Sequence, residues 1–140
     1  MRNWLFVLCL FSVTGHAETQ TLEEVTKEPI DYQRIYYGVP KEATELMFNE
    51  MAQPYKGKKF EDIGRIVDVK PNKHNKELAI VVIDTEADDN RKLFPDLSVS
   101  YPKEEATRLV KGETKIIKGT IFEVVNIGGA HVIINNADLN

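Results

Sequence analysis

Five stretches of the chain carry the apolar pattern and the β-branched composition that are typical of strands. Turn-rich polar segments such as Pro71–Lys76 separate these stretches, which cover Lys58–Val69, Leu78–Ile83, Leu97–Tyr101, Thr114–Val125 and His131–Asn136. Gly64 and Gly119 interrupt the first and fourth stretches, and a glycine inside a strand often marks a bulge or a tight bend. Val67 and Val69 break the strict alternation of the first stretch, which also predicts a bulge.

A short helix is predicted between the third and fourth strands, over residues 102–110. Pro102 suits its start, Glu104 and Glu105 complement the helix dipole in its first turn, and Gly112 follows its last turn. The fourth and fifth strands are joined across Asn126–Gly129, whose two glycines supply the positive φ of a hairpin turn.

A second helix is predicted before the first strand. Pro40 suits its first turn, and Pro54 ends it. Between the two prolines, residues follow at helical spacing: Ala43, Leu46, Met47, Glu50 and Met51. We expect this apolar stripe to dock on the domain's own barrel, with binding of a partner as the alternative.

Strand, strand, strand, helix, strand, strand is the order of an oligonucleotide/oligosaccharide-binding (OB) barrel. The predicted fold class is therefore mainly β with helices, a five-stranded OB-fold barrel (β-β-β-α-β-β) preceded by an N-terminal helix. A chain of 140 residues fits one such domain.

The first 17 residues are expected to lie outside this domain. Arg2, the apolar run Trp4–Val13 and the small residue Ala17 predict a signal peptide cleaved after Ala17, since the run has about half the roughly 20 residues of a membrane span. Residues 18–38 then form a polar leader, and residues 39–140 form the helix and the barrel. We therefore predict a periplasmic or secreted protein with no transmembrane segment after cleavage. Three tyrosines cluster at the end of this leader: Tyr32, Tyr36 and Tyr37. An exposed recognition patch and packing on the barrel are both open to them, and the amphipathic character of tyrosine favours packing.

Net charge and cysteine content narrow the functional classes. The chain carries a net charge of −4, and loss of Arg2 with the signal makes it more negative, which counts against nucleic acid as the partner. Cys9 is the one cysteine, and it follows Phe6–Leu8 where a lipoprotein signal has small residues, so we expect no lipid anchor. The mature chain is then free of cysteine and has no disulfide or thiol nucleophile.

Four short segments resemble a known barrel family: Tyr55–Lys59, Tyr101–Ala106, Leu109–Gly112 and Ile117–Thr120. A preceding helix, here Lys41–Ala52, also belongs to the family's pattern, and the likeness covers Lys41–Leu139. The chain thus resembles the exported bacterial OB-fold family whose barrel is similar to the tRNA anticodon-binding domain (tRNA_anti-like). The resemblance implies the fold and no established activity, because a fold does not carry a function.

The chain departs from this family's pattern at two kinds of position. Where family members often carry cysteines, it has Ser98, Ser100 and Ala137. Asp62 and Lys115 stand where an inward apolar residue is expected. Two strand registers that differ by one residue therefore stay open.

No pattern in the chain predicts catalysis, a cofactor or a metal site. Asp84–Asn90 has the acidic spacing of a calcium loop, but Asp89 and Pro95 replace its glycine and glutamate, so we expect a solvated acidic loop. His74 and His131 lack a second ligand at metal-binding spacing, and the serines of the third strand lack a Gly-x-Ser-x-Gly elbow. We therefore expect a protein that is not an enzyme.

The remaining candidate is the surface that OB barrels commonly offer, namely the face of the second and third strands and the loops at its edges. The predicted ligand-binding residues are Arg65, Lys73, His74, Lys76, Lys118 and Phe122. A protein that binds single strands has a basic groove in which aromatic side chains stack on the bases. One aromatic residue among scattered lysines matches this pattern only weakly. The predicted function is a non-enzymatic periplasmic module that binds a protein or small ligand. The alternatives are a single-stranded nucleic-acid binding protein and an envelope enzyme or inhibitor.

Overall fold

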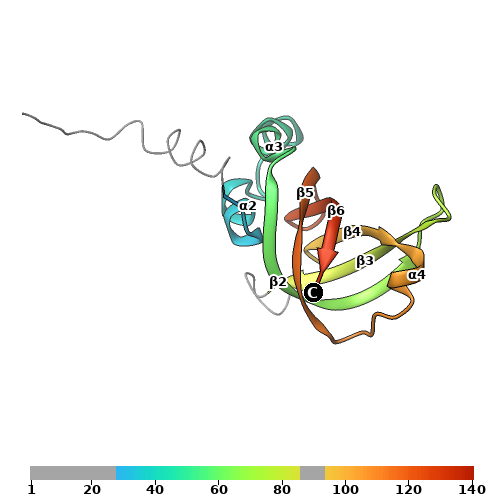
Figure 1. Cartoon of the computed structure of the whole chain (residues 1–140). Coiled ribbons are helices and arrows are strands. Elements are labelled where there is room, and N and C mark those ends of the chain that lie inside the picture. The colour runs from blue at the N-terminus through green and yellow to red at the C-terminus, as the bar shows by residue number, and fades with distance from the viewer. Residues whose placement is uncertain (1–27, 86–93) are drawn as a thin grey trace, which may run out of the picture.

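The computed structural model describes residues 28–85 and 94–140. Figure 1 shows the elements of this part of the chain: α2 (Tyr32–Gly38), α3 (Glu45–Ala52), the 3-10 helix η2 (Gln53–Tyr55), β2 (Lys59–Pro71), β3 (Leu78–Thr85), β4 (Leu97–Pro102), α4 (Lys103–Ala106), β5 (Thr114–Asn126) and β6 (Ala130–Leu139). The predicted signal peptide, Cys9 and residues 86–93, which hold most of the acidic loop, lie outside the described residues.

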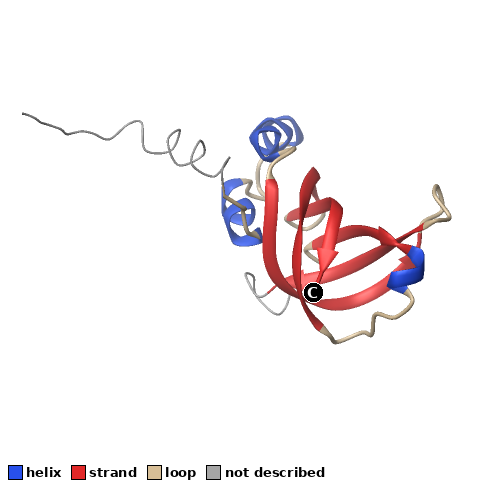
Figure 2. Cartoon of the chain, in the orientation of Figure 1, coloured by secondary structure: helices blue, strands red, loops and turns tan. Residues whose placement is uncertain are grey.

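The five strands close into a barrel in the order β2-β3-β4-β6-β5. Each neighbouring pair is antiparallel except β4 and β6, which run parallel. Figure 2 shows α2 and α3 on one side of the strands and α4 on the opposite side. Strand number, strand order and the position of α4 between β4 and β5 are those of an OB fold, so the predicted fold class is confirmed.

The barrel interior is filled mainly by aliphatic side chains, and in β4 these alternate with residues that point outward. Leu97 and Val99 of β4 are fully buried, whereas Ser98 and Ser100 are only half-buried. Every strand contributes to this core, and its buried members include Phe60, Ile66, Val81, Ile83, Ile117, Ile121, Val132 and Ile134.

Glycines allow the two long strands to bend around this core. A Cβ atom at Gly64 would lie 2.4 Å from Ile83 Cγ2, and one at Gly119 would lie 2.5 Å from Ile134 Cγ2. Both distances are below any normal contact, so the close approach of neighbouring strands requires glycine at these positions. The pairing of β2 with β3 also shifts between Ile66 and Asp68, which confirms the predicted bulge.

The chain before α3 is built into the barrel rather than lying beside it. Ile30 forms a parallel bridge with Phe60, and it is almost completely buried. Asp31 then caps α2 by accepting a hydrogen bond from Arg34 N, and α2 buries Tyr32 and Ile35. The described end of the predicted 18–38 leader is therefore folded. The tyrosine cluster divides: Tyr32 packs as expected, Tyr36 is half-buried, and Tyr37 is 69% exposed.

Helix α3 differs from the prediction in its start and in its buried face. It begins at Glu45 because Thr44 Oγ1 accepts a hydrogen bond from Met47 N, whereas Pro40 lies in the turn before it. Its buried side chains are Phe48 and Ala52, followed one turn later by the buried Tyr55 of η2. The expectation that the stripe of Leu46, Met47 and Met51 docks on the barrel is therefore wrong, since all three are exposed.

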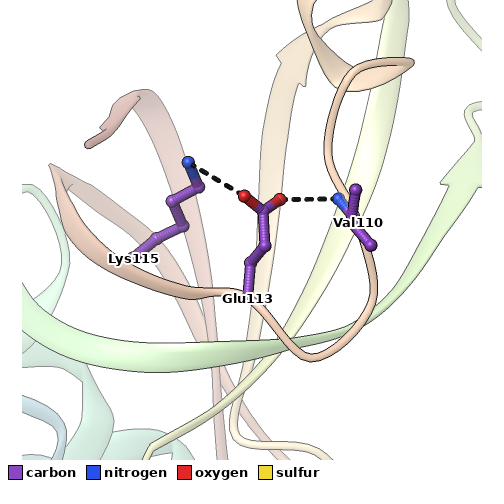
Figure 3. Close-up of polar contacts among 3 residues, drawn as sticks. All are labelled: Val110, Glu113 and Lys115. Atoms are coloured by element: carbon purple, nitrogen blue, oxygen red, sulfur yellow. Dashed lines mark hydrogen bonds and ion pairs between the residues drawn. The ribbon is translucent and has the colours of Figure 1, made fainter.

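Helix α4 lies where it was predicted but is only four residues long, over Lys103–Ala106. The chain continues through turns to Gly112, whose φ of 92° suits a glycine. Figure 3 shows what holds this turn: Glu113 accepts a hydrogen bond from Val110 N at 2.7 Å and lies 3.6 Å from Lys115 Nζ. The carboxylate therefore fixes the chain between α4 and β5.

The pairing of β2 with β5 settles the strand register that the sequence left open. Asp62 falls on the side of β2 that carries the buried Phe60 and Ile66, and it pairs with the buried Ile117. Ile63 is half-exposed, so the register is not shifted by one residue. The inward position tolerates Asp62 because its carboxylate accepts hydrogen bonds from the backbone N–H groups of Tyr32 and Ile63.

Candidate functional site

The six predicted binding residues do not form one cluster. Arg65 and Lys118 lie on the outer faces of β2 and β5, and a carboxylate residue stands opposite each of them. Arg65 pairs in register with Asp84, and Lys118 pairs with Glu61 on one side and Asp138 on the other. Because directly opposite side chains start roughly 5 Å apart, these carboxylates offset the two cations. The middle of the barrel wall therefore carries no net positive patch at these positions.

Lys73, His74 and Lys76 lie together on the exposed loop between β2 and β3. Asn72 shapes this loop, because its Oδ1 accepts hydrogen bonds from the backbone N–H groups of His74 (2.9 Å) and Asn75 (3.1 Å). Lys103 N donates to the carbonyl oxygen of Glu77, at 2.9 Å, which ties the base of the loop to the start of α4. The loop and α4 thus share one end of the barrel.

Phe122 lies elsewhere, next to the segment that follows α3. Gly57 N donates to the carbonyl oxygen of Ile121, and Lys56 pairs with Glu123 at 3.3 Å, so both neighbours of Phe122 contact the end of η2. Phe122 itself is 58% exposed. It is therefore not grouped with the loop lysines, and the described residues hold no basic groove with stacked aromatic side chains at the loop.

A cleft of about 280 Å³ opens between the β2–β3 loop and α4. Apolar side chains form most of its wall, and lysines stand at its edge. The lining residues are Val69, Lys70, Pro71, Asn72, Lys76, Leu78, Ala79, Lys103, Ala106 and Thr107. We refer to this site as the α4 cleft.

The α4 cleft combines apolar surface with one sign of charge. Three of its lining residues are exposed lysines, Lys70, Lys76 and Lys103, and none is an aspartate or glutamate. The cleft therefore presents three lysine side chains to a ligand. Such a site suits a small molecule with an apolar body and an anionic group.

Of the six predicted residues, only Lys76 lines the α4 cleft. Sequence reasoning missed Lys70 and Lys103, which come from the end of β2 and the start of α4. The predicted order of elements gave one indication that Lys70 and Lys103 lie near this loop, because the helix follows the third strand. That strand pairs with the second, and the pairing of Leu78 with Pro102 brings the start of α4 to the β2–β3 loop.

Polar groups on β3, on β6 and on the chain that enters β4 form a second constellation, in which Thr85, Asp96 and His131 are buried. The carboxylate of Asp96 accepts hydrogen bonds from the N–H and the hydroxyl of Thr85, both at 2.8 Å. His131 Nδ1 lies 2.9 Å from the carbonyl oxygen of Pro95, and its Nε2 lies 2.8 Å from Ser98 Oγ. These bonds join neighbouring strands and satisfy groups that burial would otherwise destabilise. The described residues contain no cluster of three or more metal-ligating side chains.

Comparison with known proteins gives one match in structure. No family model matches the sequence, and no curated protein does. The fold is similar to the crystal structure of a "putative nucleic acid-binding lipoprotein" from Klebsiella pneumoniae subsp. pneumoniae MGH 78578, with a TM-score of 0.56 and 16% sequence identity. The alignment covers 84% of this chain and 97% of that one. Among the described helices, none has the length and apolarity needed to cross a membrane. At this identity the likeness supports the OB-type barrel and nothing finer.

Proposed function

We propose that this protein is an exported, non-enzymatic OB-fold module that binds a small anionic ligand in the α4 cleft. The observation that carries the proposal is the composition of this cleft, in which three lysines border an apolar wall without a carboxylate. The proposal also includes membership of the exported family that the sequence resembles, and a periplasmic or secreted location. Support for export comes from the apolar N-terminal run and from the description of the structural neighbour as a lipoprotein.

The dimensions of the cleft favour a small ligand over a polymer. Its volume of about 280 Å³ is near the lower end of the range for small-molecule sites. Val69, Leu78 and Ala79 offer contact to an apolar body, while Lys70, Lys76 and Lys103 reach an anionic group. A carboxylate, sulfonate or phosphate ester that carries a short apolar chain has this chemistry.

Single-stranded nucleic acid is the second candidate, and the name of the structural neighbour favours it. Phosphates suit the same three lysines, but bases need aromatic side chains on which to stack. None of the residues that line the α4 cleft is aromatic, and Phe122 lies by η2. The net charge of −4 also opposes a polyanion. The small anion is therefore the better match.

An NMR titration with octanoate tests the small-ligand proposal. We expect the largest amide shifts at Ala79 and Ala106, which are buried residues in the cleft wall. The double variant Lys76→Ala/Lys103→Ala should weaken binding by at least about tenfold, because the loss of even one charge-assisted contact, worth roughly 1.5 kcal/mol or more, lowers affinity that much. The matched control is Lys58→Ala/Lys59→Ala, at the other end of β2, and it should leave the affinity unchanged.

Octylammonium carries the same chain with the opposite charge and should not bind. Equal binding of octanoate and octylammonium, or shifts that are absent from Ala79 and Ala106, would overturn the proposal. A labelled single-stranded oligonucleotide, titrated at several salt concentrations, decides the second candidate. Binding with a steep salt dependence that is lost in the lysine variant would favour nucleic acid instead.

A further inference from the structure

Besides its three lysines, the α4 cleft is lined by the polar side chain of Asn72, which lies on the loop between β2 and β3. Asn72 is half-buried, whereas the lysines are exposed. Its Oδ1 atom is held by the loop itself, because it accepts hydrogen bonds from the backbone N–H groups of His74 (2.9 Å) and Asn75 (3.1 Å). An amide nitrogen cannot accept such bonds, so these two contacts fix the orientation of the Asn72 amide.

The other half of this amide has no partner in the protein. The two N–H groups of Asn72 Nδ2 form no hydrogen bond with any residue in the described part of the chain. Oδ1 and Nδ2 point in different directions from one planar carbon, so Nδ2 faces away from the loop backbone that Oδ1 contacts. Since Asn72 lines the α4 cleft, Nδ2 carries the donors that this side chain can offer to a ligand.

Hydrogen-bond donors dominate the polar wall of the α4 cleft. A lysine side chain carries donors and no acceptor. The hydroxyl of Thr107 donates to the carbonyl oxygen of Glu104 at 2.7 Å, so its proton is already used within the protein. A ligand group made only of acceptor oxygens, such as an ionised carboxylate, can therefore pair with the lysines and with Asn72 together.

The loop contacts of Asn72 also lead to the lysines of the cleft. Asn75, whose N–H donates to Asn72, accepts a hydrogen bond at its own Oδ1 from Glu77 N, at 3.0 Å. The carbonyl oxygen of Glu77 accepts in turn from Lys103 N, at 2.9 Å. This series of bonds runs from the end of β2 to the start of α4. Lys76 lies within it, so the position of Lys76 depends on the loop shape that Asn72 sets.

We propose that Asn72 recognises the anionic group of the ligand, with Nδ2 donating a hydrogen bond to a ligand oxygen while Oδ1 maintains the loop that places Lys76 at the cleft. This inference rests on the proposed function and adds a neutral donor in a fixed position to it. The exposed lysines lose side-chain freedom when they contact a ligand, whereas Asn72 is already held by the loop. The bond from Asn72 therefore forms at a low cost in conformational entropy.

The side-chain amide signals of Asn72 test this contact directly. In an NMR titration of the full protein with octanoate, the Nδ2 signals of Asn72 should shift. Asn75 lies on the same loop but does not line the cleft, so its side-chain signals should shift much less. A purely structural role of Asn72 acts through Oδ1 and predicts no such difference between the two residues.

Two aspartate variants separate the donor from the charge. Asn72→Asp removes the N–H donors and keeps an oxygen for the N–H groups of His74 and Asn75, so the loop should keep its shape. Octanoate binding should weaken at least tenfold, or about that, because a charge-assisted hydrogen bond is lost and a carboxylate takes its place. Asn75→Asp adds the same charge to the same loop and keeps the oxygen that accepts from Glu77 N. This control should lower the affinity by no more than about threefold.

The backbone amide signals of His74 and Asn75 in each variant show whether the loop is intact. Equal affinities of the two variants would overturn the role of Asn72 and leave the proposed function standing. Asn72 side-chain signals that do not move, in a wild-type protein that binds octanoate, would have the same meaning. Absence of octanoate binding by the wild-type protein would overturn the proposed function and this inference together.

Discussion

The phenolic hydroxyl of Tyr32 donates a hydrogen bond to the carbonyl oxygen of Ala130, at 2.5 Å, although the two residues are 98 positions apart. Both residues are buried, and they join the first turn of α2 to the start of β6. Helix α2 is therefore anchored to the barrel by a polar contact as well as by apolar packing. The segment before α3 is therefore an integral part of the folded domain.

Replacement of Tyr32 by phenylalanine should lower the free energy of unfolding by about 1–2 kcal/mol, because the change keeps the ring and removes a buried hydrogen bond. Chemical denaturation of both proteins measures the difference. Tyr37→Phe is the matched control, since Tyr37 is 69% exposed, and its effect should stay within about 0.5 kcal/mol. Equal effects of the two substitutions would show that the Tyr32 bond contributes nothing.

The acid dependence of stability should reveal the inward position of Asp62. Burial raises the pKa of Asp62 above its ordinary value of 3.8, the neighbouring Asp31 and Asp96 raise it further, and hydrogen bonds from Tyr32 N and Ile63 N oppose the shift. Since the pKa is higher in the folded state, the ionised carboxylate lowers stability at neutral pH. That loss disappears as the pH falls through the raised pKa toward 3.8.

The measurement compares wild type with Asp62→Asn by denaturation over this acidic range, together with an NMR titration of the Asp62 carboxyl group. We expect wild type to gain stability relative to the variant as the pH falls, and we expect the titration midpoint to lie above 3.8. A midpoint at or below that value, or a constant difference in stability, would contradict the assignment.

The two faces of α3 should respond differently to truncation. Phe48 is 1% exposed and anchors the helix, so Phe48→Ala should lower the free energy of unfolding by about 3–5 kcal/mol. Leu46→Ala removes a side chain that is 70% exposed, so its effect should stay within about 0.5 kcal/mol. Thermal or chemical unfolding distinguishes the two, and a large effect of Leu46→Ala would mean that α3 packs through the face predicted from the sequence.

The strands and their order were predictable because local signals agreed with the final structure. The β-branched run Leu78–Ile83 became β3, and the two glycines of the hairpin turn, Gly128 and Gly129, do have positive φ. Bends at Gly64 and Gly119 followed from their places inside long apolar stretches. In each case the physical requirement acts on a few neighbouring residues, so the sequence displays it directly.

The helices before the barrel were harder to predict because tertiary contacts decide them. In α3 the larger number of apolar residues lies on the exposed side, whereas Phe48 and Ala52 are the residues that pack into the core. The buried residues of the preceding segment, Ile30, Tyr32 and Ile35, are spaced irregularly and separated by polar residues. No single periodicity therefore marks that segment as part of the core.

The α4 cleft shows a similar limit for the site. Its lysines come from β2, from the β2–β3 loop and from α4, and Lys70 and Lys103 are 33 positions apart. Loop lysines were found from composition, whereas the lysines that face them depend on how α4 packs on the end of β3 and β4. A grouping of this kind follows from the closed barrel and not from any local motif.

The contact between Ser98 and His131 leads to a last prediction. Because the carbonyl oxygen of Pro95 can only accept a hydrogen bond, His131 Nδ1 must carry the proton that it shares with this oxygen. In the neutral form of the ring, Nε2 then accepts from the Ser98 hydroxyl, whose oxygen lies 2.8 Å away. Long-range ¹H–¹⁵N spectra should therefore show the Nδ1–H tautomer.

Ser98→Ala should lower the free energy of unfolding by about 1 kcal/mol, as expected for one hydrogen bond. Ser100→Ala, two residues along β4 and similarly half-buried, should have a smaller effect, because no hydrogen bond of its side chain occurs in the described structure. The Nε2–H tautomer, or equal effects of the two serine substitutions, would contradict this arrangement.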